Sequence, residues 1–202
     1  KRKRKAKVKI AKPRILIPVL PGTNGEYEGA RVFHQAGGLA EVFVLKDLTG
    51  FELRDSLSAF AEKLKESQIL MLPGGVSGWD EPEGAGKYGA ALLNEPIVKE
   101  AVLSLLEQDG LILGIGNGFQ ILLRTGLLPY GEYRKIEETS PQLIDNQHGQ
   151  YLTGYVRTKV ISNASPWLQG IDVGEEFLLP ISCAKGRLIG NNDELLALFE
   201  KG

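Results

Sequence analysis

The chain has 202 residues, of which 43% are hydrophobic, and this is enough to bury the core of one domain. The formal net charge is −1, but seven of the first nine residues are Lys or Arg, and the remainder holds 17 basic against 25 acidic residues. Basic charge confined to one terminal run argues against a nucleic-acid-binding protein, although a nucleic-acid or nuclear-import patch stays an alternative for the run itself. We expect residues 1–12 to be a basic tail or linker and residues 13–202 to form the domain.

A single cysteine, Cys183, excludes an internal disulfide framework and a cysteine-based metal cluster. No apolar stretch approaches the ~20 residues that a membrane-spanning helix needs, and the charged N-terminus lacks the apolar core of a signal peptide. The sequence therefore predicts a cytoplasmic protein with no membrane contact, no metal and no cofactor.

The first half of the chain alternates predicted strands and helices. Apolar, β-rich runs predict strands over residues 14–20, 41–45 and 68–72. Residues 26–36 have helical character between the first two strands. A second helix follows the second strand, and its apolar positions recur at helical spacing; they are Leu53, Leu57, Phe60, Ala61 and Leu64.

Two further helices are expected after the third strand, the second over residues 96–108 with Pro96 in its first turn. Residues 111–115 predict a fourth strand, which a helix follows at once. Strands that alternate with helices pair in parallel, so we expect a doubly wound α/β sheet. Ligands bind such sheets at the carboxyl ends of strands, where the loops that start at Pro21, Pro73 and Gly114 should gather.

Beyond Tyr130 the pattern changes to alternation over residues 142–162 and an extended apolar run over residues 177–182. These runs predict an antiparallel extension of the sheet. Residues 191–201 predict a closing helix capped near Asn192 or Asp193.

Glycines at positions 114, 116 and 118 lie between the fourth strand and its helix. This spacing is typical of a nucleophile elbow, a sharp turn whose flanking side chains would collide while the central residue projects into a pocket. The pattern alone is equally compatible with a packing turn or a dinucleotide phosphate loop, although that loop requires a third glycine where Phe119 stands.

Six segments together resemble, in order and spacing, the glutaminase domain of formylglycinamidine ribonucleotide synthase. They read PVLPGTN from Pro18, MLPGGVS from Met71, DEP from Asp80, GIGNGFQ from Gly114, LLPYGE from Leu127 and SPWL from Ser165. The resemblance runs from about Lys12 to the end of the chain. It implies the class I glutamine amidotransferase fold, a flavodoxin-like three-layer α/β sheet, and a synthetase domain or subunit as partner.

In that family an elbow cysteine attacks the amide of glutamine, a histidine transfers the proton and a glutamate orients the histidine. Backbone N–H groups near the elbow and in the glycine-rich loop after the third strand stabilise the oxyanion. The resemblance assigns the remnants of this oxyanion and glutamine pocket to Gly74, Gly75, Val76, Asn117, Gly118 and Gln120.

The chain departs from the family at the positions of the catalytic residues. Gly116 stands at the position of the nucleophile, and Gly25 replaces a second family cysteine. Cys183 and Lys185 stand where the family has histidine and glutamate in a Ser-His-Gly-Glu-Gly-Arg segment. Trp79 replaces a small residue beside the oxyanion loop and is expected to fill part of the pocket.

The His-Pro-Glu segment that supplies the family's base and acid has no counterpart in the chain. With nucleophile, base and acid missing, we expect no catalysis of glutamine hydrolysis.

The other candidate residues favour structural interpretations. His34 and His148 lack the family context and are interpreted as surface or structural residues. Cys183 lacks a helix N-terminus or histidine that would activate its thiol, so the interpretation as a small hydrophobe at a strand end is preferred. Glu81 and Glu83, with Asp80, are interpreted as a solvated loop and not a metal site.

Three hypotheses remain open from the sequence. The first is a glutaminase-like domain that has lost catalysis, by natural change or redesign, and that docks to a synthetase or serves as a scaffold, with glutamine as a ligand if the pocket is open. The second is a piece of a working enzyme whose remaining triad lies in another segment, which Gly116 argues against. The third is a non-catalytic module on a flavodoxin-like scaffold that binds a small ligand, a nucleotide or a partner.

Overall fold

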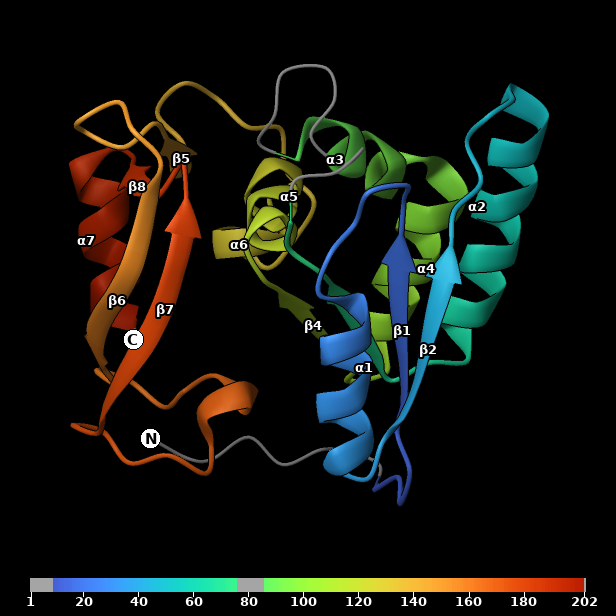
Figure 1. Ribbon diagram of the computed structural model, residues 1–202, viewed down its shortest axis with the longest axis horizontal. Coiled ribbons are helices and arrows are strands. Elements are labelled where there is room, and N and C mark those ends of the chain that lie inside the picture. Colours follow the sequence, from blue (N-terminus) through green and yellow to red (C-terminus); the bar gives the residue numbers. More distant parts are fainter. Residues whose placement is uncertain (1–8, 76–85, 202) are drawn as a thin grey trace. The chain divides into compact units, whose positions relative to one another are not determined.

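The computed structural model describes residues 9–75 and 86–201 (Figure 1). The chain divides between Ile136 and Glu137 into two compact units. We call residues 9–136 the sheet unit and residues 137–201 the hairpin unit. The sequence-based division into a tail and one domain from residue 13 stays a prediction.

The sheet unit is a four-stranded parallel sheet with helices on both faces, which confirms the predicted doubly wound architecture (Figure 1). The strands lie in the order β2-β1-β3-β4. In chain order the elements are β1 (Arg14–Val19), α1 (Glu26–Gln35), β2 (Leu39–Val44), α2 (Gly50–Lys65), β3 (Ile69–Leu72), α3 (Lys87–Asn94), α4 (Pro96–Glu107), β4 (Leu111–Gly114), α5 (Asn117–Thr125) and α6 (Leu127–Tyr130).

Successive side chains of β1 pack on opposite faces of the sheet, and this joins the helix layer on each face to the sheet between them. Ile15, Ile17 and Val19 pack in a cluster with residues of α1, on one face of the sheet. Leu16 belongs to the larger cluster that α2, α3, α4 and α5 form on the opposite face. Successive side chains of a strand point to opposite faces, so one apolar strand is buried on both sides.

Helix α2 shows why the predicted periodicity folds as it does. Thr49 caps the helix, since its hydroxyl accepts a hydrogen bond from the backbone N–H of Glu52 at 3.2 Å. Four of the five predicted apolar positions are buried, and Leu53 packs half-buried against the same cluster.

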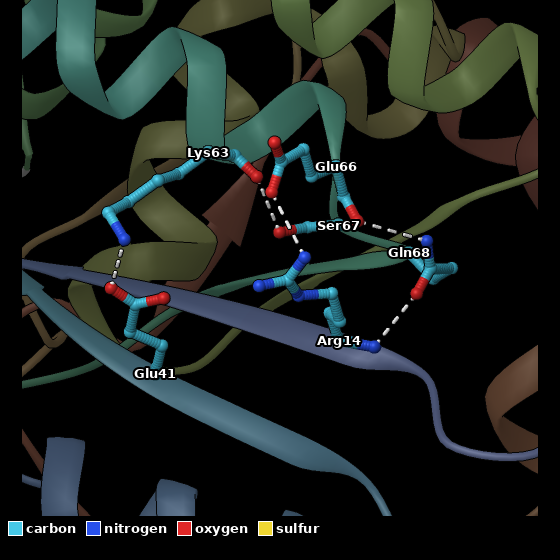
Figure 2. Close-up of polar contacts among 6 residues, drawn as sticks. All are labelled: Arg14, Glu41, Lys63, Glu66, Ser67 and Gln68. Carbon is cyan, nitrogen blue, oxygen red and sulfur yellow. Dashed lines mark hydrogen bonds and ion pairs between the residues drawn. The ribbon is translucent and has the colours of Figure 1, made fainter.

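Polar side chains join the end of α2 to the start of β1 (Figure 2). The guanidinium of Arg14 pairs with the Glu66 carboxylate at 3.0 Å. The Gln68 side chain accepts from the Arg14 backbone N–H at 2.8 Å and donates to the Glu66 carbonyl at 3.2 Å. Through these contacts Gln68, the residue directly before β3, links the start of β1 to the end of α2.

The hairpin unit contains two antiparallel two-stranded sheets, β5 with β8 and β6 with β7. Antiparallel strands are therefore confirmed for this half of the chain, and they form sheets of their own. The elements are β5 (Gln142–Ile144), β6 (Leu152–Lys159), the 3-10 helix η2 (Pro166–Leu168), β7 (Glu176–Cys183), β8 (Arg187–Ile189) and α7 (Asn192–Lys201).

The cap of α7 corrects the predicted one. The Asn191 side-chain oxygen accepts the backbone N–H of Asp193 at 2.8 Å. The capping residue is thus Asn191, one or two positions before the residues expected, because the helix already begins at Asn192. In the part of the chain that the structure describes, no helix is long and apolar enough to cross a bilayer.

Candidate functional site

Gly116 lies at the corner between β4 and α5. The strand ends at Gly114, the helix begins at Asn117, and Gly116 is the N-cap residue with φ 56° and ψ −114°. L side chains rarely adopt this positive φ, and strain of this kind is typical of functional turns.

The two outer glycines of the turn are required by sterics. A Cβ on Gly114 would lie 2.6 Å from the carbonyl oxygen of Gly118. A Cβ on Gly118 would lie 2.1 Å from the carbonyl oxygen of Leu72 in β3. Any side chain at either position would collide with backbone, so α5 packs against β3 and β4 only with glycine at both.

The central glycine has a different environment. Among residues 9–75 and 86–201, a Cβ on Gly116 would have one neighbour within 4 Å, the Cα of Gly74 at 3.4 Å. This separation is an ordinary van der Waals contact, and Gly116 is exposed. The described residues therefore leave room for a side chain at the centre of the turn, although the chain supplies none.

Three loops meet at the carboxyl edge of the sheet, as expected for a parallel sheet. A Cβ on Gly74 would lie 3.1 Å from the Ile115 carbonyl oxygen, and one on Gly75 would lie 3.0 Å from the Asn24 backbone nitrogen. The loops after β1, β3 and β4 are thus in close backbone contact around Gly74 and Gly75.

Polar side chains also reach this edge. The Asn117 side-chain nitrogen donates a hydrogen bond to the Gly75 carbonyl oxygen. The side-chain oxygen of Gln120, in the first turn of α5, is buried and has no hydrogen-bond partner among the described residues. A buried acceptor without a donor costs free energy, and such groups often mark a site that a ligand completes.

Sequence reasoning missed Glu26, the first residue of α1. One of its carboxylate oxygens is buried and has no hydrogen-bond partner within the described part of the chain. The available signal was its position directly after Gly25, which stands where the family has a cysteine.

The other candidate residues have local structural partners or lie outside the described residues. His34 Nε2 lies 3.1 Å from the Ala40 carbonyl oxygen, and His148 Nδ1 accepts the Gln150 N–H at 3.2 Å. Cys183 is a half-buried free thiol at the end of β7. The residues outside the described part are Val76, Trp79, Asp80, Glu81 and Glu83.

Over residues 9–75 and 86–201, no group of three or more His, Cys, Asp or Glu side chains is placed to hold a metal ion.

Comparison with known families decides the chain's classification. The family model of the CobB/CobQ-like glutamine amidotransferase domain matches residues 12–202. The chain belongs to this family. The resemblance to a glutaminase domain read from the six segments is thereby confirmed.

Curated relatives of this amidotransferase domain carry one name. The chain is 33% identical over 184 residues to the phosphoribosylformylglycinamidine synthase subunit PurQ of Symbiobacterium thermophilum, and 32% identical over 185 residues to that of Dehalococcoides mccartyi. The matches cover 91% and 90% of the chain. The chain spans 66% and 65% of these two relatives, slightly less than two thirds of their length.

A solved structure has the same fold. The structure of PurLQS from Thermotoga maritima contains a chain that matches with a TM-score of 0.65 and 26% identity. The match covers 90% of this chain and 71% of that one. The flavodoxin-like, class I glutamine amidotransferase fold is thereby confirmed.

Proposed function

We propose that the chain is a glutamine amidotransferase domain of formylglycinamidine ribonucleotide synthesis that binds glutamine at the elbow edge and does not hydrolyse it. Two findings support the pathway: the relatives are named as subunits of phosphoribosylformylglycinamidine synthase, and the matching structure is a PurLQS assembly. The partner we propose is accordingly the synthetase of that pathway.

One observation carries the loss of catalysis. The elbow keeps the two glycines that sterics demand, Gly114 and Gly118, and the described residues leave room at its centre, yet position 116 is also glycine. Glutamine hydrolysis by this family needs a sulfur atom there to form a bond to the amide carbon and release ammonia. Since Gly116 has no side chain, no thioester can form at this position.

The neighbouring residues do not offer a substitute. The two histidines of the chain each contact a backbone atom: His34, in α1, contacts the Ala40 carbonyl oxygen of β2, and His148 accepts the Gln150 N–H of its own loop. Neither contact is the histidine–carboxylate pair that orients a general base. The chemistry that remains for the pocket is recognition of glutamine by backbone groups and by Gln120.

The test is turnover and binding measured on the same preparation. The purified chain is incubated with glutamine, and release of glutamate and ammonia is followed, while calorimetry measures glutamine binding. We expect binding without turnover, and we expect Gly116→Cys to give little or no turnover because base and acid are still lacking.

Two results would count against the proposal. Robust hydrolysis by the unmodified chain would end the account of lost catalysis. A thermal shift with nucleotides and none with glutamine would favour the rival module that binds another small ligand.

A further inference from the structure

One hydrogen bond joins the two loops that form the candidate pocket. The Asn117 carboxamide, in the first turn of α5, donates from Nδ2 to the carbonyl oxygen of Gly75, after β3. The two residues are 42 positions apart in the chain. An Asn at the start of a helix usually bonds to nearby backbone of its own segment, so a bond to another loop is a specific feature of this site.

Backbone contacts hold the described part of this loop, Gly74 and Gly75. Gly74 and Gly75 have no side chains, Gly75 is exposed, and its φ is +97°. Glycine loses more conformational freedom on ordering than any other residue, so a pair of glycines is held mainly by contacts made to its backbone. The carbonyl that Asn117 engages is such a contact.

A bond to a carbonyl oxygen restrains more than one atom. The peptide group is planar, so the direction of the C=O bond determines the orientation of the whole group. Holding the Gly75 carbonyl toward α5 therefore holds the loop against the elbow, where a Cβ on Gly74 would lie 3.7 Å from the Gly116 Cα.

We propose that Asn117 is a positioning residue whose carboxamide holds the Gly74–Gly75 loop against the elbow and so gives the glutamine pocket its shape. This proposal rests on the proposed function for the ligand. It goes beyond that function because it assigns a role to the Asn117 side chain, separate from the backbone N–H that the family resemblance assigns to the oxyanion.

The informative variant is Asn117→Asp. The two side chains have nearly the same shape, but an ionised carboxylate only accepts hydrogen bonds and cannot donate to the Gly75 carbonyl. An acid in the first turn of a helix is favoured by the helix dipole, so the variant should keep α5. Asn117→Ala removes the donor without adding a charge and serves as a second variant.

A matched control lies in the hairpin unit. The Asn163 side chain donates from Nδ2 to the Ile171 carbonyl oxygen at 3.1 Å. Asn163→Asp makes the same chemical change and removes the same kind of bond within the other unit. A general effect of losing an Asn-to-carbonyl hydrogen bond should appear in Asn163→Asp as well as in the Asn117 variants. An effect on the pocket should appear only in the Asn117 variants.

Two measurements decide the proposal. The carbonyl ¹³C chemical shift of Gly75 reports the hydrogen bond directly, and calorimetry reports glutamine affinity. We expect both Asn117 variants to move the Gly75 shift and to weaken glutamine binding about fivefold, the effect of losing one ordinary hydrogen bond. Asn163→Asp should leave both unchanged.

The outcomes separate this proposal from the proposed function. If the Gly75 chemical shift does not move in either Asn117 variant, Asn117 does not hold the Gly74–Gly75 loop through this hydrogen bond. A moved shift with unchanged glutamine affinity overturns its role in shaping the pocket. If the unmodified chain does not bind glutamine, both the proposed function and the role of Asn117 in shaping the pocket are overturned. The Gly75 chemical shift still decides whether the Asn117–Gly75 hydrogen bond exists.

Discussion

Gly118 lies so close to Leu72 that a single added carbon would sit 2.1 Å from the Leu72 carbonyl oxygen. The contact joins the first turn of α5 to the last residue of β3. It sets how closely the helix approaches the sheet, and hence where the elbow points.

We expect Gly118→Ala to destabilise the chain by ~3 kcal/mol or more, because backbone must shift to admit the methyl group. Gly116→Ala should cost only about 1 kcal/mol, the cost of a side chain at positive φ without a collision. Urea unfolding of both variants measures the difference.

Gly37→Ala is the control for the backbone conformation alone. Gly37 has φ +89° and a Cβ there would have no neighbour within 4 Å. It should match Gly116→Ala to within a few tenths of a kcal/mol. Equal losses for Gly116→Ala and Gly118→Ala would contradict the distinction between central and outer glycines.

The elements of the sheet unit were predictable because each depends on local pattern. The continuous apolar run that includes Ile15, Leu16 and Ile17 predicts a buried strand, and the structure shows that its residues belong to two core clusters. The elbow at Gly116 was equally predictable, since glycine spacing reflects close backbone approach at one place.

What the sequence left open depends on contacts between distant segments. The bond from Asn117 to Gly75 and the orphan carboxylate oxygen of Glu26 arise only when loops from different strands meet. Likewise the pattern of β6 and β7 predicts antiparallel pairing, but it does not say that these strands form a sheet of their own.

Tyr133 gives the sheet unit a dependence on alkaline pH. Its hydroxyl donates to the Leu93 carbonyl oxygen at 2.9 Å, and burial raises the pKa of the phenol well above its ordinary value of 10.0. The unfolded chain therefore loses the phenolic proton before the folded chain does. Stability from this group is complete below pH 10 and falls as pH rises above it.

We expect Tyr133→Phe to cost about 1 kcal/mol at pH 8, where one hydrogen bond is lost. At pH 10.5 the cost should be smaller, because the variant lacks the group whose deprotonation favours unfolding. Urea unfolding of the chain and the variant at these two pH values measures the change in cost. A cost that grows with pH would contradict the assignment.

Arg14 is held by two contacts of different kind, an ion pair with Glu66 and a backbone bond to Gln68 (Figure 2). The side chains of the ion pair are 54% and 65% exposed. Water and salt screen such a pair, so Glu66→Gln should cost no more than a few tenths of a kcal/mol.

Gln68→Ala removes two hydrogen bonds to backbone groups, one from the Arg14 N–H and one to the Glu66 carbonyl. We expect it to cost ~1 kcal/mol. Unfolding measured in low salt and in about 1 M NaCl separates the two contacts, because only the ion pair is screened. A loss in Gln68→Ala that disappears in high salt would show that charge, and not backbone pairing, holds this corner.

The cap of α7 tests the correction made to the sequence-based prediction. Asn191 satisfies the N–H of Asp193, one of the four N–H groups that the first turn of a helix leaves unpaired. Asn191→Ala should therefore destabilise the helix by about 1 kcal/mol, while Asn192→Ala should cost much less, since alanine is a good helix former inside the first turn. Amide exchange in residues 193–199, followed by NMR, measures opening of α7 itself, independently of the sheet unit. Faster exchange in Asn192→Ala than in Asn191→Ala would restore the cap that the sequence alone suggested.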